Sequence, residues 1–304
     1  MAPSVIVVGA SGAVGRPLME EFLAQKSQFR RIAVLSDPSK VSRFIEVQAK
    51  GIEVVEGSFL EAKSYEGFEV VISLVGNVAM KLQPGIIEAA IAGGARHFIP
   101  SEFGADIAQN GIWKNRYFRD KVVTREHLRA RAKDTPGFHY TLILSGAVAE
   151  YTVSEFNGVD VEKHVARTYG YPKARLHVTA MHECCFYSVC KFIVGAVLLP
   201  FDDPSQSIRE LRVSGDCLTW EKLMELLEEV QGAKYDIKYL DPALAVEKQE
   251  AARAQGDSEG ELFWSATATM ANGYALLPEP SDNHRFAFEP ETAKETLIRM
   301  FGSE

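Results

Sequence analysis

The segment spanning residues 5–15 constrains the fold most, because an apolar run passes directly into three evenly spaced glycines. Residues 5–8 are all Val or Ile, and Gly9, Gly12 and Gly15 follow before a segment with helical periodicity. Such a run is typical of a strand buried on both faces of a parallel sheet. The helix after the turn aims free N–H groups and its positive dipole end at an anion. We therefore expect this turn to bind the pyrophosphate of a dinucleotide.

Each glycine has its own expected task. Gly9 makes the sharp turn, Gly12 lets the phosphates approach closely, and Gly15 lets the helix pack closely on the sheet. The spacing is Gly-x-x-Gly-x-x-Gly, so the prediction depends on the strand before the turn and the helix after it. A glycine-rich turn without a ligand is the alternative. The remaining residues of the expected pyrophosphate site are Ser11, Ala13 and Val14.

Apolar strands alternate with helical segments up to about residue 145, which predicts an α/β fold with a Rossmann-type, doubly wound parallel sheet. Ligands bind at the carboxyl ends of such strands, so Gly9, Leu35, Gly76 and Ser101 are expected to line one rim. The expected strands are 5–8, 32–35, 53–56, 70–75, 97–100 and 140–144, and the expected helices are 16–25, 42–50, 82–93 and 117–133.

Beyond about residue 148 the pattern loosens and prolines interrupt shorter elements. We expect residues 1–150 to form an NAD(P)-binding domain and residues 151–304 a smaller C-terminal substrate-binding region, partly interleaved with it. Within that region we expect a buried helix at 181–198 and a helix begun by Thr219 and ended before Gly232. The polar stretch 253–260 is expected to be a loop.

Composition excludes several classes of function. A net charge of -8 over 304 residues argues against nucleic-acid binding, which needs clustered Lys and Arg. His182-Glu183 lacks the second histidine of a zinc motif, since Phe186 stands there, and the four cysteines show no paired-ligand spacing, so no metal is expected. The chain shows neither a signal-like segment nor an apolar run of about 18 residues. We expect a cytoplasmic protein without membrane contacts, either a monomer or a homodimer.

The stretch Pro100-Ser101-Glu102-Phe103-Gly104 resembles the signature of the isoflavone-reductase-like, NmrA-like branch of the atypical short-chain dehydrogenase/reductases. The glycine turn and the segments 72–76 and 214–220 are similar to those of the same family, so the resemblance spans about residues 4–240. It implies a dinucleotide-binding fold. Active members reduce carbon–carbon double bonds or benzylic ethers with NADPH, using a lysine beside the nicotinamide, whereas other members are redox-responsive regulators.

The resemblance implies that Lys121, about twenty residues after the signature, is the catalytic lysine. Partial burial would lower its pKa and suit it to proton transfer. Tyr117 stands four residues before Lys121, as in the Tyr-x-x-x-Lys pair of the wider superfamily, and Ser101 would complete a triad that favours carbonyl reduction. The alternatives are a solvated lysine and a Tyr117 that precedes the helix.

Cofactor choice depends on the residues after the second strand. NADPH-preferring relatives place an arginine there, whereas this chain has Ser36 followed by Asp37, which suits the 2′-hydroxyl of NAD. Lys40 and Arg43 offer positive charge to a 2′-phosphate instead. The resemblance favours NADP(H), with NAD left open. Two further residues, Gly76 and Asn77, are expected beside the ribose or nicotinamide.

The expected function is an NAD(P)H-dependent oxidoreductase that transfers hydride to a C=C or C=O bond of a small molecule. The resemblance suggests an aromatic or polyketide-like secondary metabolite. Two alternatives stay open: an NmrA-like dinucleotide-sensing regulator without turnover, and a non-redox enzyme of secondary metabolism on the same fold.

Overall fold

The computed structural model describes residues 2–109, 111–181, 188–203 and 205–302. By its internal contacts the chain divides into two compact units. Unit 1 comprises segments 1–102, 120–143 and 182–211, and unit 2 comprises segments 103–119, 144–181 and 212–304. Both units are discontinuous in sequence, whereas the expected regions 1–150 and 151–304 are continuous. The assignment of those two regions to cofactor and substrate stays a prediction.

The main sheet has seven strands in the order β11-β6-β5-β4-β1-β2-β3. Strands β1 to β6 pair in parallel, and their order reverses between β1 and β4. This order confirms the Rossmann-type α/β fold, which places ligands at the point of reversal. The strands are β1 Ser4–Val8, β2 Arg31–Ser36, β3 Glu53–Glu56, β4 Val70–Ser73, β5 His97–Ile99, β6 His139–Leu144 and β11 Ile208–Arg212.

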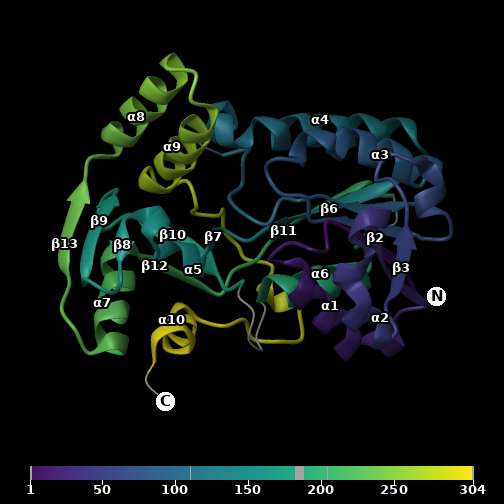
Figure 1. Ribbon diagram of the computed structural model, residues 1–304, viewed down its shortest axis with the longest axis horizontal. Coiled ribbons are helices and arrows are strands. Elements are labelled where there is room, and N and C mark those ends of the chain that lie inside the picture. Colours follow the sequence, from purple (N-terminus) through teal and green to yellow (C-terminus); the bar gives the residue numbers. More distant parts are fainter. Residues whose placement is uncertain (1, 110, 182–187, 204, 303–304) are drawn as a thin grey trace. The chain divides into compact units, whose positions relative to one another are not determined.

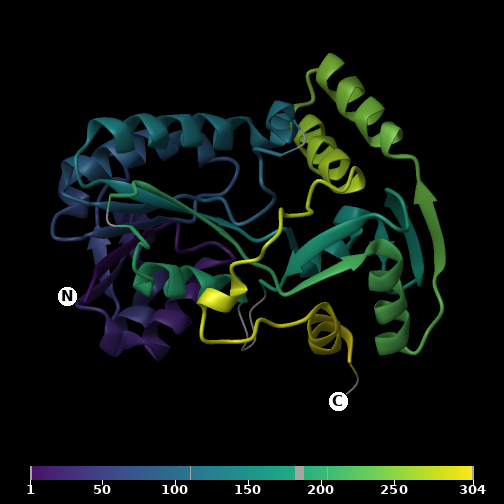
Figure 2. The same ribbon diagram turned by 180° about the vertical axis from the view of Figure 1, so that it is seen from behind.

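Helices cover both faces of this sheet, so its central strands are buried; residues 5–8 of β1 are each 0% exposed, whereas the edge strand β3 has no fully buried residue. Figure 1 and the reverse view in Figure 2 show α3 and α4 on one face, with α1, α2 and α6 on the other. The helices are α1 Gly15–Ala24, α2 Ile45–Ala49, α3 Gln83–Ala92, α4 Arg119–Asp134 and α6 Ser188–Leu198. Residues 182–187 of the helix expected at 181–198 lie outside the described residues.

Two helix starts differ from expectation. The helix expected at 42–50 begins as the 3-10 helix η2, Pro38–Phe44, and continues as the five-residue α2. Pro38 and the Asp37 cap start this turn early, because Asp37 accepts a hydrogen bond from the N–H of Ser39. The helix expected at 117–133 begins at Arg119, after the 3-10 turn η6, Arg116–Phe118.

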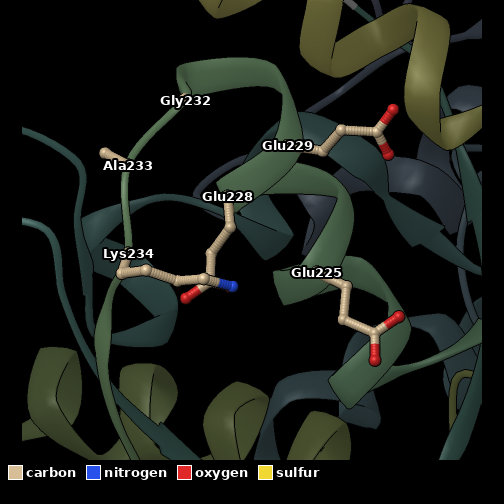
Figure 3. Close-up of a pocket in the computed structure, with 6 residues that line it drawn as sticks. All are labelled: Glu225, Glu228, Glu229, Gly232, Ala233 and Lys234. Atoms are coloured by element: carbon tan, nitrogen blue, oxygen red, sulfur yellow. The ribbon is translucent and has the colours of Figure 1, made fainter.

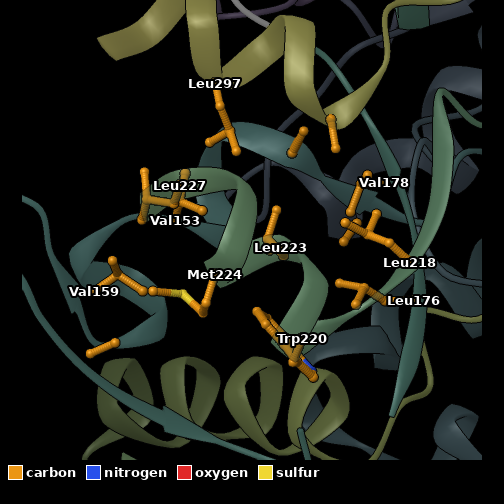
Figure 4. Close-up of a cluster of buried hydrophobic side chains, with 14 of the residues drawn as sticks. Val153, Val159, Leu176, Val178, Leu218, Trp220, Leu223, Met224, Leu227 and Leu297 are labelled. Atoms are coloured by element: carbon orange, nitrogen blue, oxygen red, sulfur yellow. The ribbon is translucent and has the colours of Figure 1, made fainter. Parts of the chain in front are cut away.

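Unit 2 contains two small sheets, ordered β12-β10-β7 and β13-β9-β8. Their strands are β7 Ala147–Val148, β8 Val159–Asp160, β9 Val165–Tyr169, β10 Arg175–Thr179, β12 Asp216–Thr219 and β13 Asp236–Leu240. The helices are α5 Ala149–Thr152, α7 Trp220–Gln231, α8 Pro242–Ala254, α9 Ser258–Ala271 and α10 Ala293–Phe301. Figure 4 shows the core of this unit, in which Trp220, Leu223 and Leu227 of α7 pack among Leu176, Val178 and Leu297.

Helix α7 confirms the expected boundaries. The Oγ1 of Thr219 accepts a hydrogen bond from the N–H of Lys222 at 3.1 Å, and Gly232 ends the helix with φ +63°. The loop expected at 253–260 is limited to residues 255–257, because α8 reaches Ala254 and α9 begins at Ser258. Asp257 caps α9 by accepting the N–H of Gly260 at 2.9 Å, so a polar, glycine-containing stretch here starts a helix.

Candidate active site

Two of the three glycines in the turn after β1 are required by the backbone around them. Gly9 has φ +82°, and a Cβ on it would lie 3.0 Å from the carbonyl carbon of Leu74. A Cβ on Gly15 would lie 1.9 Å from the carbonyl oxygen of Ala10. Gly9 therefore makes the turn as expected. Gly15 permits a close backbone approach at the start of α1.

The other two glycines of the expected cofactor site are not closely packed. A Cβ on Gly12 would meet its nearest protein atom at 3.5 Å, and one on Gly76 would meet none within 4 Å among the described residues. Packing of the protein therefore does not require glycine at either position. The N-cap residue of helix α1 is Val14, whose side chain offers the N–H groups of the helix no acceptor. This uncapped N-terminus with open room before it fits a pyrophosphate. Around it the expected site residues Ser11, Ala13 and Asn77 are exposed.

The residues after β2 include a carboxylate that caps a helix and two exposed cations. Ser36 is buried, and its Oγ donates to the carbonyl of Asp37. Asp37 accepts the N–H and the hydroxyl of Ser39, and these hydrogen bonds hold the pKa of its carboxyl below the usual range. Asp37 is thereby occupied as a helix cap. Lys40 and Arg43 are exposed and form no ion pair within the part of the chain that the structure describes.

Lys121 is buried in the first turns of α4, with 8% of its surface exposed. Its Nζ donates a hydrogen bond to the main-chain carbonyl of Glu102, just beyond β5. Burial lowers the pKa of Lys121; the Glu102 carboxylate opposes this effect and the Arg125 guanidinium adds to it. The amine is thus shielded from bulk water and easier to deprotonate than an ordinary lysine. The solvated alternative does not describe this residue.

A buried polar network adjoins the carbonyl that receives this hydrogen bond. The sequence had indicated a role for Ser101, but none for the side chains of Glu102, Arg125, Gln83 and Thr124. Arg125 donates from Nε and Nη2 to the two carboxylate oxygens of Glu102, at 2.9 and 3.0 Å. Gln83 of α3 accepts the N–H of Ser101 at 3.0 Å and donates to Thr124 of α4 at 3.3 Å. The signal for the ion pair was a glutamate inside the signature and an arginine one turn after the lysine.

The other two expected catalytic residues have different surroundings. The hydroxyl of Ser101 makes no hydrogen bond within the described residues, while its N–H is held by Gln83. Tyr117 lies in η6, before α4 begins, so the helical same-face argument for pairing it with Lys121 does not apply. Its N–H donates to the Oγ of Ser265 at 3.0 Å. Catalytic roles for both residues stay predictions.

A cavity at the end of α7 is unrelated to the turn after β1. Its volume is about 320 Å³. Figure 3 shows residues of its lining, among them Glu225, Glu228 and Glu229. Each of these carboxylates has a lysine partner: Lys222, Lys234 and Lys294, at 3.1, 2.6 and 2.7 Å respectively. The acidic groups are therefore neutralised by the protein, and the cavity offers no features of a dinucleotide site.

Unit 2 also carries an aromatic cluster. Phe156 contacts Phe263 at 5.2 Å between ring centroids, Phe263 contacts Trp264 at 5.0 Å, and Trp264 contacts Tyr169 at 5.7 Å. The Nζ of Lys248 lies 4.2 Å from the centre of the Trp264 ring, within the range of a cation–π contact. Phe263 is 37% exposed, so this cluster reaches the surface of the unit.

The described residues contain neither a cluster of metal-binding side chains nor a membrane-spanning helix. No group of three or more His, Cys, Asp or Glu side chains there is arranged to hold a metal ion. No described helix combines the length and the apolar character needed to cross a membrane. His182 and its neighbours Glu183, Cys184 and Cys185 lie outside the described residues.

Comparisons with known proteins agree with these features. Oxidoreductase aprR of Aspergillus flavus is 26% identical over 273 residues, covering 86% of this chain and 84% of that protein. The isoflavone reductase homolog IRL of Zea mays is 26% identical over 262 residues, covering 81% of this chain and 79% of that protein.

Solved structures share the fold. The structure of AtPrR2 with NADP+ and (+)pinoresinol has a TM-score of 0.77 at 19% identity and covers 99% of both chains. A crystal structure of isoflavone reductase has a TM-score of 0.75 at 18% identity, covering 99% of this chain and 100% of that one. The model of the NmrA-like family matches residues 1–253. With its glycine turn, strand order and signature, this chain belongs to the NmrA-like family.

Proposed function

We propose that this protein is an NADPH-dependent reductase that transfers hydride to a C=C or C=O bond of a small aromatic or polyketide-like secondary metabolite. The observation that carries the proposal is the buried Lys121, which belongs to the same compact unit as the glycine turn. A regulator that only sensed the dinucleotide would need the turn but not a buried proton donor.

The chain supplies binding, orientation and a proton. The N-terminus of α1 and the turn Gly9–Gly15 hold the pyrophosphate, and Gly76 leaves room beside the nicotinamide half. NADPH, when bound, supplies the hydride. As the acceptor carbon gains hydride, the π electron pair of the double bond moves to the neighbouring carbon or oxygen. The ammonium of Lys121 gives that atom a proton, and the resulting amine regains one from water.

The preference for NADPH is supported by the residues after β2. Asp37 caps η2, while the exposed Lys40 and Arg43 follow it with charges that match a 2′-phosphate. The structures of AtPrR2 with NADP+ and of leucoanthocyanidin reductase from Vitis vinifera with NADPH support the same choice.

The substrate class is supported by the names of the relatives and by unit 2. Relatives include isoflavone reductase homologs and a bifunctional pinoresinol-lariciresinol reductase of Forsythia intermedia. The partly exposed aromatic cluster of Phe156, Phe263 and Trp264 supplies ring surfaces that suit an aromatic molecule.

The test is to titrate the protein with NADPH and NADH, and then to follow oxidation of the reduced nicotinamide with a panel of enones, ketones and benzylic ethers. We expect NADPH to bind and at least one acceptor to be reduced. Lys121→Ala should lower kcat by about 100-fold or more with little change in the Kd of NADPH. Lys133→Ala, an exposed change at the other end of α4, is the matched control.

Each failure has its own meaning. Absence of binding by both nucleotides would contradict the proposal altogether. Tight NADPH binding with no turnover on the whole panel would favour the sensing alternative. Full turnover by Lys121→Ala would leave the reductase standing and remove the lysine from its mechanism.

A further inference from the structure

The hydrogen-bond acceptor of Lys121 is a main-chain oxygen, and the residue that carries this oxygen is fixed from several sides. Both oxygens of the Glu102 carboxylate accept from Arg125, and these side chains are 1% and 3% exposed. The preceding N–H, that of Ser101, is held by the fully buried Gln83. The bidentate contact between the Arg125 guanidinium and the Glu102 carboxylate fixes the orientation of the two groups as well as their distance.

The backbone at this point is also unusually tight. The N–H of Glu102 donates to the carbonyl of Pro100 at 2.8 Å, and Phe103 follows with φ +30°. A phenylalanine adopts a left-handed conformation only where surrounding contacts over-determine it, and such positions cluster at functional sites. The turn aims the Glu102 carbonyl at the lysine. The ion pair with Arg125 fixes the side chain of Glu102, and thereby the turn.

We propose that Glu102 and Arg125 are positioning residues, which hold the amine of Lys121 at its working place through the Glu102 carbonyl. The proposal rests on the reductase function proposed above. Among the described residues, the charges that act most strongly on the amine are those of the Glu102 carboxylate, from the connection after β5, and the Arg125 guanidinium, from the next turn of α4. Because these two charges act on the lysine in opposite directions, changing one of them changes the charge balance around it.

The decisive measurement is the titration of Lys121 by NMR, in the full-length protein labelled with [ε-13C]lysine. Its signal is identified by its absence in Lys121→Arg. Glu102→Gln keeps the main-chain carbonyl but removes the anion, so we expect the midpoint of the Lys121 titration to fall by at least one pH unit, or about tenfold in the equilibrium constant. Glu126→Gln, an exposed change on the same helix, should leave it unmoved.

The second variant tests geometry at constant charge. Arg125→Lys keeps the cation but loses the two-pronged contact, so kcat should fall about tenfold while the Kd of NADPH stays within twofold. The matched control is Arg129→Lys, the same exchange at an exposed position one turn later. Circular dichroism and thermal melting establish that each variant is folded, and Arg125→Lys remains available if Glu102→Gln is not.

An unchanged Lys121 titration in Glu102→Gln overturns the proposal. So does a kcat of Arg125→Lys within twofold of Arg129→Lys. A failure of the reductase function is recognised separately, since the wild-type protein would then oxidise no NADPH with any acceptor. The NMR titration does not depend on turnover.

Discussion

Position 15 leaves no room for even a methyl group. A Cβ there would lie 1.9 Å from the oxygen of Ala10, and a backbone atom cannot move aside as a flexible side chain can. We expect Gly15→Ala to lower the free energy of unfolding by about 3 kcal/mol, measured by urea denaturation. Gly76→Ala should leave stability within about 0.5 kcal/mol of wild type and weaken NADPH binding about tenfold, because its methyl group enters only the open space. Equal stability losses at both positions would contradict this assignment.

The residues proposed to bind the 2′-phosphate, Lys40 and Arg43, lie a few residues after the position at which NADPH-preferring relatives place an arginine. Replacing both Lys40 and Arg43 with Ala should raise the Kd of NADPH by about tenfold to 100-fold and leave that of NADH unchanged, since only NADPH carries the extra phosphate. Equilibrium titration with both nucleotides checks the result. Asp37→Asn serves as the comparison: it keeps a good helix cap and should tighten NADPH binding slightly by removing a repulsive charge. A double variant that still prefers NADPH would show that other residues read the phosphate.

Strands β5 and β6 begin at two histidines whose rings are in contact. The ring centroids of His97 and His139 lie 4.7 Å apart, and the buried Arg209 of β11 shares the hydroxyl of Thr141 with His97. Burial, then the charges of His139 and Arg209, hold the pKa of His97 well below its usual range. The histidine therefore stays neutral in the folded protein.

This cluster makes stability depend on pH below the ordinary histidine pKa. The unfolded chain takes up a proton at His97 below about pH 6.5 and the folded chain does not, so the free energy of unfolding falls as the pH drops from about 6.5. His97 contributes a slope of up to about 1.4 kcal/mol per pH unit. Urea denaturation at pH 7 and pH 5.5 should show a smaller loss for His97→Gln than for wild type. The exposed control His284→Gln should behave as wild type.

The elements that sequence predicted well are those with strong local signals. Buried strands such as β1 have a continuous apolar run, and α7 has Thr219 and Gly232 at its ends, so pattern and structure agree within a residue or two. The prediction of a loop over 253–260 was wrong for most of its residues, because polar residues and glycine are typical of loops and of helix starts alike. Only the hydrogen bond from Gly260 to Asp257 distinguishes the two.

For the site, the sequence identified single residues but not how they depend on one another. The glycine turn and Lys121 were predicted from spacing and resemblance. The contact between Lys121 and the Glu102 carbonyl joins α4 to the connection after β5, and a main-chain oxygen carries no sequence signal. The role of Gln83 could not be predicted either, because this residue lies in a third element, α3, and acts through its side-chain amide alone.

The C-terminal helix of unit 2 is held by buried charge. Arg299 of α10 donates to Glu150 at 2.8 Å and to Glu291 at 2.9 Å, and the two carboxylates are only 6% and 7% exposed. Arg299→Met should destabilise the protein by about 3 to 5 kcal/mol, because it leaves two buried carboxylates without this partner. Lys294→Met removes an exposed ion pair of the same helix and should cost less than about 1 kcal/mol. Denaturation curves of the two variants that coincide would contradict this.

The main sheet is completed late in the chain. Strand β11 pairs with β6 at one edge, and α6 covers the face on which α1 lies, yet both come from beyond residue 187. A fragment of residues 1–150 lacks both elements and exposes the edge of β6 together with apolar surface. We expect it to aggregate in size-exclusion chromatography under conditions where the full chain does not. A monomeric fragment with a cooperative melt would show that the first 150 residues suffice.

The same threading governs how this protein is made. As a nascent chain leaves the ribosome, segments of the second unit emerge before the first unit has received its last strand. The edge of β6 therefore stays unpaired while some sixty further residues are translated before β11. Slow synthesis over that interval would prolong exposure of the edge, and binding by a chaperone there would favour a correct finish.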